Sequence, residues 1–173
     1  MDRLATAALL ALALAAPLRA QHDHVAHAAH GPASADVPSG LDADEAAGLA
    51  EGRGLGMARP AERNRYPGPL HVLELADSLG LDARQRETAE RLRAEMLAEA
   101  VPLGEQILTV ERHLDALFAS GDATPEAVDR MTAHAAQLRG RLRAAHLRTH
   151  LGMRDALTPE QIAAYDQLRS HAP

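Results

Sequence analysis

The sequence predicts an all-α protein built around one long antiparallel helical hairpin with short flanking helices. Its apolar residues are mostly Ala and Leu, and it contains one Phe, two Tyr and no Trp. Ala and Leu are strong helix formers, whereas the bulky side chains that usually fill the core of a sheet are almost missing. Two long segments with helical apolar periodicity are joined by Ser120-Gly121-Asp122-Ala123, which predicts the hairpin.

Charge and cysteine content exclude several kinds of protein. The 18 basic residues are all arginine and the formal net charge is −6, which argues against a nucleic-acid partner. Because the chain has no cysteine, neither a disulfide nor a lipid-modified cysteine is possible. The chain must therefore fold by packing alone.

Residues 1–20 have the pattern of a secretory signal peptide. A run from Leu4 to Ala16, apolar except for Thr6, is followed by Pro17 and by Leu18-Arg19-Ala20, which ends on a small residue suited to signal peptidase. The run is shorter than the ~20 residues that a membrane-spanning helix needs. We therefore predict export to the periplasm, cleavage near Ala20 and no stable membrane span in the mature chain. Retention of the segment as an anchor is the alternative.

Residues 21–40 lack apolar periodicity and are predicted to be a disordered, histidine-rich tail. The histidines of this tail are His22, His24, His27 and His30. Neutral imidazole is the commonest ligand of zinc, copper and nickel, so the tail could capture a metal ion weakly. A solvated polar leader is the alternative interpretation.

Residues 41–65 are predicted to form a short helix and a glycine-rich linker. Asp42 is a capping residue and Glu45 follows it by three positions, which favours a helix that runs into the glycines at 52, 54 and 56. A helix this short has marginal stability by itself.

Residues 66–173 are the predicted hairpin domain, and they open with a rigid turn at Tyr66-Pro67-Gly68-Pro69. Pro69 suits the first position of a helix that should run to Leu79 and stop at Gly80.

The first long helix should start after Asp82 and end near Ser120. The Asp82 carboxylate can accept from the backbone N–H of Gln85 while the Gln85 side chain reaches back, and Pro102 should kink the helix. Thr124-Pro125 then starts the return helix.

Each long helix carries one apolar stripe, and the two stripes should face each other. At 1.5 Å per residue the first helix would be roughly 55 Å long. A hairpin of that length cannot cover its own stripes, which predicts either a homodimer or an exposed apolar groove.

A second helix start follows the hairpin, at Leu157-Thr158-Pro159-Glu160-Gln161-Ile162. Thr158 caps the helix, Gln161 closes the capping box, and Leu157 can pack on Ile162. Leu81-Asp82-Ala83-Arg84-Gln85 is a partial copy of this segment. Either segment alone is a capping box of a kind found in many helical proteins, but together they bracket the hairpin.

In this arrangement the chain resembles the Spy/CpxP family of periplasmic proteins, whose signature is a repeated Leu-Thr-x-x-Gln, and its heavy-metal resistance relatives such as ZraP and CnrX. The segment 66–75 also looks like members of that group, and the similarity covers about residues 66 to 170. The chain departs from the signature at Asp82, where threonine is expected, although aspartate caps a helix equally well.

The resemblance implies a small periplasmic stress-response protein, usually dimeric, with either ATP-independent chaperone activity or metal sensing. The partners it implies are unfolded periplasmic client proteins, or a sensor or anti-sigma partner. The resemblance implies that no cofactor is required, although binding of a divalent transition metal (Zn, Cu, Ni or Co) is compatible with this family.

His146 and His150 are the candidate metal ligands of the hairpin itself, with Met153 nearby. The two histidines are one turn apart, so both imidazoles could reach one ion. They should lie level with Glu99 and Glu95 of the first helix, but the angular positions put the carboxylates and the histidines on opposite flanks of the stripe. A structural or solvated role for both histidines is the alternative.

The metal-sensing branch represented by CnrX has a site with two histidines one turn apart on its first helix, a glutamate on the second, and a histidine and a methionine on the last. His71 corresponds to the first of these positions. Leu75 stands where its partner would be, and His150 lies three rather than four residues before Met153. The resemblance therefore implies only part of that site.

Sequence motifs of enzymes are not found in this chain. It has no glycine-rich phosphate loop and no His-Glu-x-x-His motif, so we predict a non-enzymatic protein. A long hairpin whose apolar strip is flanked by arginines and acids could hold unfolded chains without ATP, which favours the chaperone. A heavy-metal sensor is the first alternative, and a purely structural helical dimer is the second.

Overall fold

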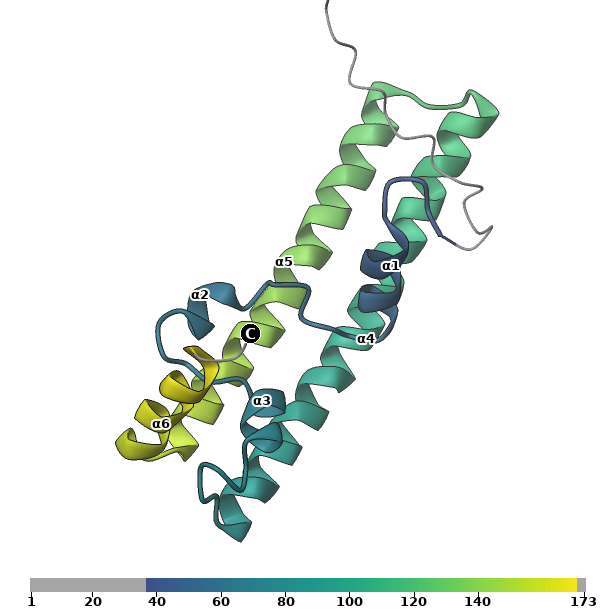
Figure 1. Cartoon of the computed structure of the whole chain (residues 1–173). Helices are drawn as coiled ribbons and strands as arrows, with labels where there is room; N and C mark the ends of the chain where they lie inside the picture. Colours follow the sequence, from purple (N-terminus) through teal and green to yellow (C-terminus); the bar gives the residue numbers. More distant parts are fainter. Residues whose placement is uncertain (1–36, 171–173) are drawn as a thin grey trace, which may run out of the picture. The chain divides into compact units, whose positions relative to one another are not determined.

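The computed structural model describes residues 37–170, which form six helices and no strand (Figure 1). The predicted all-α class is confirmed. The predicted signal peptide and the four tail histidines lie outside the described residues.

The hairpin consists of α4 (Ala83–Ser120) and α5 (Pro125–Ala156), which pack along each other as the two apolar stripes predict (Figure 1). The helix α4 continues through Pro102 and ends at Gly121, whose φ of 79° is the left-handed conformation that glycine tolerates best. Thr124 then caps α5 by accepting from the backbone N–H of Ala127. Both predicted starts and the predicted turn are confirmed.

One core cluster fills the middle of the hairpin. Leu103 and Ile107 of α4 meet Leu138 and Leu142 of α5, and all four are almost fully buried. Burial of side chains this size typically stabilises a fold by about 1.5–3 kcal/mol each. The hairpin is therefore held mainly by apolar contact between its two helices.

The helix α1 (Ala43–Ala50) covers part of the stripe of α4, with Leu49 fully buried between them. An ion-pair network reinforces this position, because Arg139 of α5 reaches Glu45 at 2.8 Å and Glu111 of α4 at 3.4 Å. The short helix α1, whose stability by itself is predicted to be marginal, is therefore part of the core.

The segment before α1 also lies against α4. Both the backbone N–H and the hydroxyl of Ser39 donate to the carboxylate of Asp115, and Val37 packs on the same core cluster. The tail predicted for residues 21–40 thus differs from the structure over 37–40, because polar capping and a single apolar contact hold these residues in place.

A second core cluster closes the open end of the hairpin. It joins α3 (Pro69–Glu74) and α6 (Pro159–Ser170) to the two long helices, with Val72, Met153 and Tyr165 buried. The prediction that α3 reaches Leu79 was wrong. After Glu74 the backbone N–H of Ala76 donates to the carbonyl of Leu73, only three residues back, so the α-helix ends. The turns that follow place Ala76, Leu79 and Leu81 in the second core cluster.

Between α1 and α3 the chain forms a short helix, α2 (Arg59–Glu62), which the sequence analysis did not predict. A single turn with a proline at its start has no apolar periodicity to reveal it. Among the helices of residues 37–170, none is both long enough and apolar enough to cross a membrane.

Gly104 allows the closest approach between two helices, because a Cβ there would lie 1.9 Å from the carbonyl oxygen of Leu49. We expect Gly104→Ala to displace α1 and to destabilise the protein by about 1.5–3 kcal/mol, the burial energy of Leu49. The measurement is urea unfolding followed by circular dichroism.

Gly140→Ala on α5 is the matched control, since no atom lies within 4 Å of its Cβ position. It should stabilise the protein by ~0.5–1 kcal/mol through helix propensity alone. Equal stability of the two variants would contradict the close packing of α1.

Candidate functional site

The glutamines of the two sequence motifs meet at the open end of the hairpin. Gln85 Nε2 donates to Gln161 Oε1 at 2.7 Å, and Gln161 Nε2 donates to Gln85 Oε1 at 3.0 Å. Each glutamine also closes its own capping box, with its Oε1 accepting from the backbone N–H of Asp82 or Thr158. Both predicted boxes are confirmed, and they are joined to each other.

The remaining amide hydrogens of this pair are also used. Gln85 Nε2 donates to the carbonyl of Ala156 at the end of α5, and Gln161 Nε2 donates to the carbonyl of Leu79 at 3.2 Å. A primary amide has two donors and two acceptor positions, and every one of them is occupied here. Glutamate could close a capping box, but it could not make the two donations, which explains why both motifs end in glutamine.

Leu81 and Leu157, the first residues of the two motifs, are buried in the second core cluster, where Ile162 also packs. Leu157 and Ile162, which are predicted to pack on each other, therefore both belong to this cluster. The motif residues thus form a structural joint between α4, α5 and α6.

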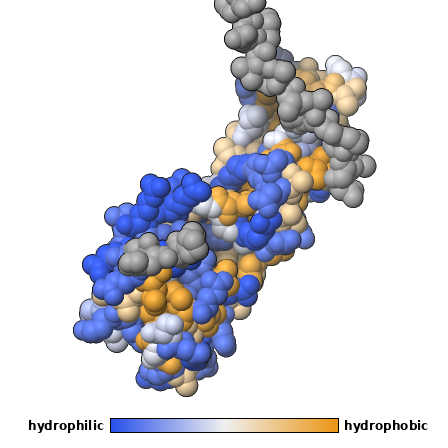
Figure 2. Space-filling model, in the orientation of Figure 1, coloured by the Kyte–Doolittle hydropathy of each residue, from blue (hydrophilic) through white to orange (hydrophobic). Residues whose placement is uncertain are grey.

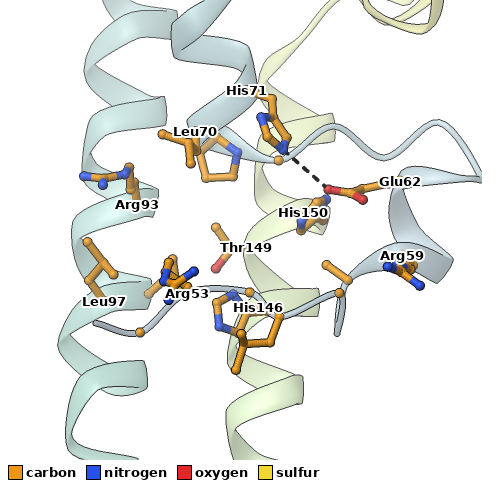
Figure 3. A pocket seen from close by; sticks show the side chains of 18 of the residues that line it. Arg53, Arg59, Glu62, Leu70, His71, Arg93, Leu97, His146, Thr149 and His150 are labelled. Atoms are coloured by element: carbon orange, nitrogen blue, oxygen red, sulfur yellow. Dashed lines mark ion pairs between the residues drawn. The ribbon is translucent and has the colours of Figure 1, made fainter. Parts of the chain in front are cut away.

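A pocket of about 470 Å³ lies between α5, α4, α3 and the glycine-rich loop that follows α1 (Figure 3). Its walls include the three candidate histidines of the hairpin domain: His71, His146 and His150. The sequence analysis identified these residues separately, and the fold brings them to one cavity.

His71 and His150 both have protein partners. The Nδ1 atom of His71 is 3.0 Å from Glu74 Oε2, and its Nε2 is 3.8 Å from Glu62 Oε1. His150 Nδ1 donates to the carbonyl of Tyr66 at 2.8 Å. Arg154, one turn further along α5, lies over the Tyr66 ring with its Cζ atom 4.1 Å from the ring centroid. His150 therefore helps to hold the loop before α3 against α5.

His146 is buried without a partner for one of its nitrogens. The side chain is 5% exposed, and its Nε2 atom makes no hydrogen bond to any described residue. Burial, with a smaller contribution from His150, lowers the pKa of His146 below its ordinary value. The ring is therefore neutral at pH 7 and has an unused hydrogen-bonding position.

The other predicted metal ligands lie apart from this pocket. Met153 is fully buried in the second core cluster. Glu99 lies at the predicted level, but its partner across the hairpin is Arg148, at 2.7 Å, and Glu95 pairs with Arg91. Over residues 37–170, no group of three or more His, Asp or Glu side chains is placed to hold a metal ion.

The arginines of the pocket were missed by the sequence analysis. Arg53, Arg59 and Arg93 share its walls with the histidines (Figure 3). Isolated arginines on helices and loops usually indicate a solvated surface, and only the tertiary structure gathers these three. The Gly-Arg-Gly-Leu-Gly stretch at 52–56 is the one signal in the sequence that could have drawn attention to this loop.

A second, more open groove of about 550 Å³ lies at the tip of the hairpin. Its apolar wall is formed by Ala116, Leu117, Ala127 and Met131, and Arg130 borders it. The neighbouring Phe118 is 64% exposed. Figure 2 shows that apolar residues reach the surface near this tip. The exposed groove predicted from the length of the hairpin is therefore present at this end.

Comparison with known proteins gives one match. A sequence model of the LTXXQ motif family protein matches residues 70–169. No curated protein and no solved structure shows significant similarity to the chain.

The reciprocal amide pair predicts the effect of replacing its glutamines. In Gln85→Glu, a carboxylate oxygen would face Gln161 Oε1 and the Ala156 carbonyl, so we expect a destabilisation of about 2–4 kcal/mol at pH 7. Those neighbouring acceptors favour the protonated acid, so its pKa should be raised in the folded state. The deficit relative to wild type should therefore shrink as the pH falls through that raised pKa.

Gln106→Glu is the matched control, because the exposed Gln106 also donates to a carbonyl of α4, that of Pro102. It should change stability by less than about 0.5 kcal/mol. Chemical unfolding of both variants between pH 4 and 8 measures the difference, and equal, pH-independent losses would show that the pair has no special role.

Proposed function

Because the chain belongs to the LTXXQ motif family, the Spy/CpxP-type family that its two motifs predict, we propose that it is an exported, non-enzymatic, ATP-independent chaperone of the periplasm. Its clients are unfolded polypeptides in the cell envelope. The observation that carries the proposal is the open apolar groove at the tip of the hairpin.

The groove has the chemistry that weak client binding requires. Leu117 and Met131 offer apolar surface, and methionine adapts its shape to different side chains. Phe118 adds a large exposed ring beside them. Contacts of this kind act through burial of apolar area and have little directionality, so they accept many sequences. Binding and release then need no nucleotide.

Charge beside the groove also influences which client segments bind. Arg130 borders the apolar wall, and an arginine stem can cover apolar surface while its guanidinium stays in water. Client segments with acidic residues beside apolar ones are therefore favoured.

The proposal predicts that the tip is required for the suppression of aggregation. We expect the double variant Leu117→Ser, Phe118→Ser to need about tenfold more protein than wild type to suppress aggregation, which corresponds to ~1.4 kcal/mol of lost binding energy. The measurement is light scattering of a reduced or chemically unfolded test protein that is diluted into buffer with the chaperone.

Leu151→Ser is the control, because Leu151 is a leucine on α5 that is 53% exposed, against 64% for Phe118, and does not line the groove. It should suppress aggregation as well as wild type does. Sedimentation velocity of the same variants tests the second alternative, a purely structural homodimer. If the tip variant dissociates a dimer while suppression is unchanged, the groove is a subunit interface and the chaperone proposal is wrong.

Metal binding is the second candidate function, and His146 and His150 favour it. Tyr66 occupies Nδ1 of His150, and Nε2 of His146 has no hydrogen-bond partner in the described part of the chain. Two nitrogens are fewer than the three or four protein ligands of a zinc site, and the arginines of the pocket disfavour a cation. The described residues therefore do not fit a complete site for Zn, Cu, Ni or Co. The tail histidines are the remaining candidates.

We expect zinc binding by the full chain, measured by isothermal titration calorimetry, to be unchanged in the His146→Ala, His150→Ala variant. Replacement of His22, His24, His27 and His30 by alanine should abolish it, because flexible imidazoles are then the only ligands. The opposite pattern, with binding lost only in the His146 and His150 variant, would favour the metal sensor over the chaperone.

A further inference from the structure

The helix α1 lies in a seat on one flank of α4 (Figure 1). The floor of this seat is formed by Ala100, Gly104 and Leu108, which recur every four residues of α4 and are all buried. Leu49 of α1 is fully buried in the same core cluster, and a Cβ on Gly104 would lie 1.9 Å from the Leu49 carbonyl oxygen. The seat therefore accepts one leucine together with the backbone that carries it.

A charged side chain lies beside this floor. Arg139 of α5 donates to Glu45 of α1 at 2.8 Å and to Glu111 of α4 at 3.4 Å. Positions four apart lie on one face of a helix, so Glu45 and Leu49 face the hairpin together. The α1 seat, which consists of the floor and Arg139, thus matches a helical turn with an acidic residue four positions before a leucine.

The position of α1 depends on these contacts rather than on the stability of the helix itself. Its eight residues are fewer than the ~12–15 that an isolated helix needs in water. The loop behind it is strained, because Leu55 has a φ of 45°, which is unfavourable for a leucine. The Leu55 side chain packs against α1, since a Cβ on Gly48 would lie 2.4 Å from it. Release of α1 would remove that packing and relieve the strain, which favours local opening of this segment.

The α1 seat continues into the exposed tip of the hairpin. Ile107 belongs to the core cluster of the seat, and Leu114 and Phe118 follow it after seven and eleven residues, so these three side chains share one face of α4. Leu114 is half-buried and Phe118 is 64% exposed. Release of α1 would therefore extend the apolar surface of the tip along α4 toward Gly104.

We propose that the α1 seat is a second binding surface for client segments, and that α1 is its internal competitor. The preferred client segment forms a helical turn with Asp or Glu four positions before Leu, the chemistry with which α1 itself occupies the seat. A minor state of about 0.1–10% with α1 released is enough, because a client that binds only this state shifts the population toward it. The role in client binding rests on the proposed chaperone function, whereas competition between α1 and a peptide does not.

The first test locks α1 in place. Because the chain has no cysteine, the variant Glu45→Cys, Arg139→Cys has only two thiols, and a short bismaleimide with a disulfide in its linker can join them. To suppress client aggregation, the joined protein should be needed at about threefold or higher concentration than the same sample after reduction of the linker. Arg91→Cys, Glu95→Cys is the matched control, because this ion pair lies within α4 and joining it leaves α1 free.

The second test places a peptide with the sequence of residues 41–51 in competition with α1. A fluorescent peptide of this sequence should bind the full-length Leu49→Ala variant about tenfold or more tightly than wild type, because the tethered Leu49 no longer competes. The same peptide with its Glu45 and Leu49 positions exchanged should bind neither protein. Fluorescence anisotropy measures the binding, and circular dichroism checks that the variant is folded.

The tip variant Leu117→Ser, Phe118→Ser separates the α1 seat from the tip groove. Equal suppression by the joined and the reduced protein, or equal binding of the two peptides, would overturn the seat, while loss of suppression in the tip variant would still support the proposed function. Unchanged suppression in the tip variant, together with binding of only the natural peptide sequence, would overturn the proposed function and support the seat.

Discussion

The reciprocal hydrogen bonds between Gln85 and Gln161 join the ends of three helices at the open end of the hairpin. Each amide caps its own helix and donates both to the other glutamine and to a backbone carbonyl of a third segment. The pair therefore fixes the start of α4, the end of α5 and the start of α6 relative to one another. Because Gln85 near the start of α4 donates to Ala156 at the end of α5, the joint also helps to set which part of α5 faces which part of α4. The positions of the pocket and of the tip groove follow from that register.

The long stripes of the hairpin are covered unevenly, and this unevenness creates both candidate binding surfaces. Toward the open end, α3 and α6 build a second core cluster, and α1 covers the middle of α4. At the tip Leu117 and Met131 are only partly buried and Phe118 is exposed, so apolar surface remains open there. A hairpin with a fully covered stripe would be more stable, but it would have no surface for unfolded chains.

The two surfaces differ in chemistry. The tip groove is open and mostly apolar, which suits weak binding of many sequences. The pocket is bordered by the glycine-rich loop, by Arg53, Arg59 and Arg93, and by the buried His146. The arginines disfavour a divalent metal ion in the pocket, although the spacing of His146 and His150 by itself is compatible with one. The spacing of histidines on a helix is therefore weak evidence for a metal site when the charges of the neighbouring side chains are unknown.

The local structure of this protein could be predicted from its sequence. Its helix class, the capping boxes at Asp82 and Thr158 and the turn at Gly121 all depend on residues within a few positions of one another, and local hydrogen bonding and backbone sterics decide them. Features that depend on residues far apart in the sequence could be found only in the folded structure. The core role of α1 depends on the missing side chain of Gly104, α3 ends early because its next residues turn into the second cluster, and Arg59 and Arg93 come to one pocket from separate helices. Periodicity and composition are one-dimensional, so they cannot report which surfaces meet when α4 and α5 fold against each other.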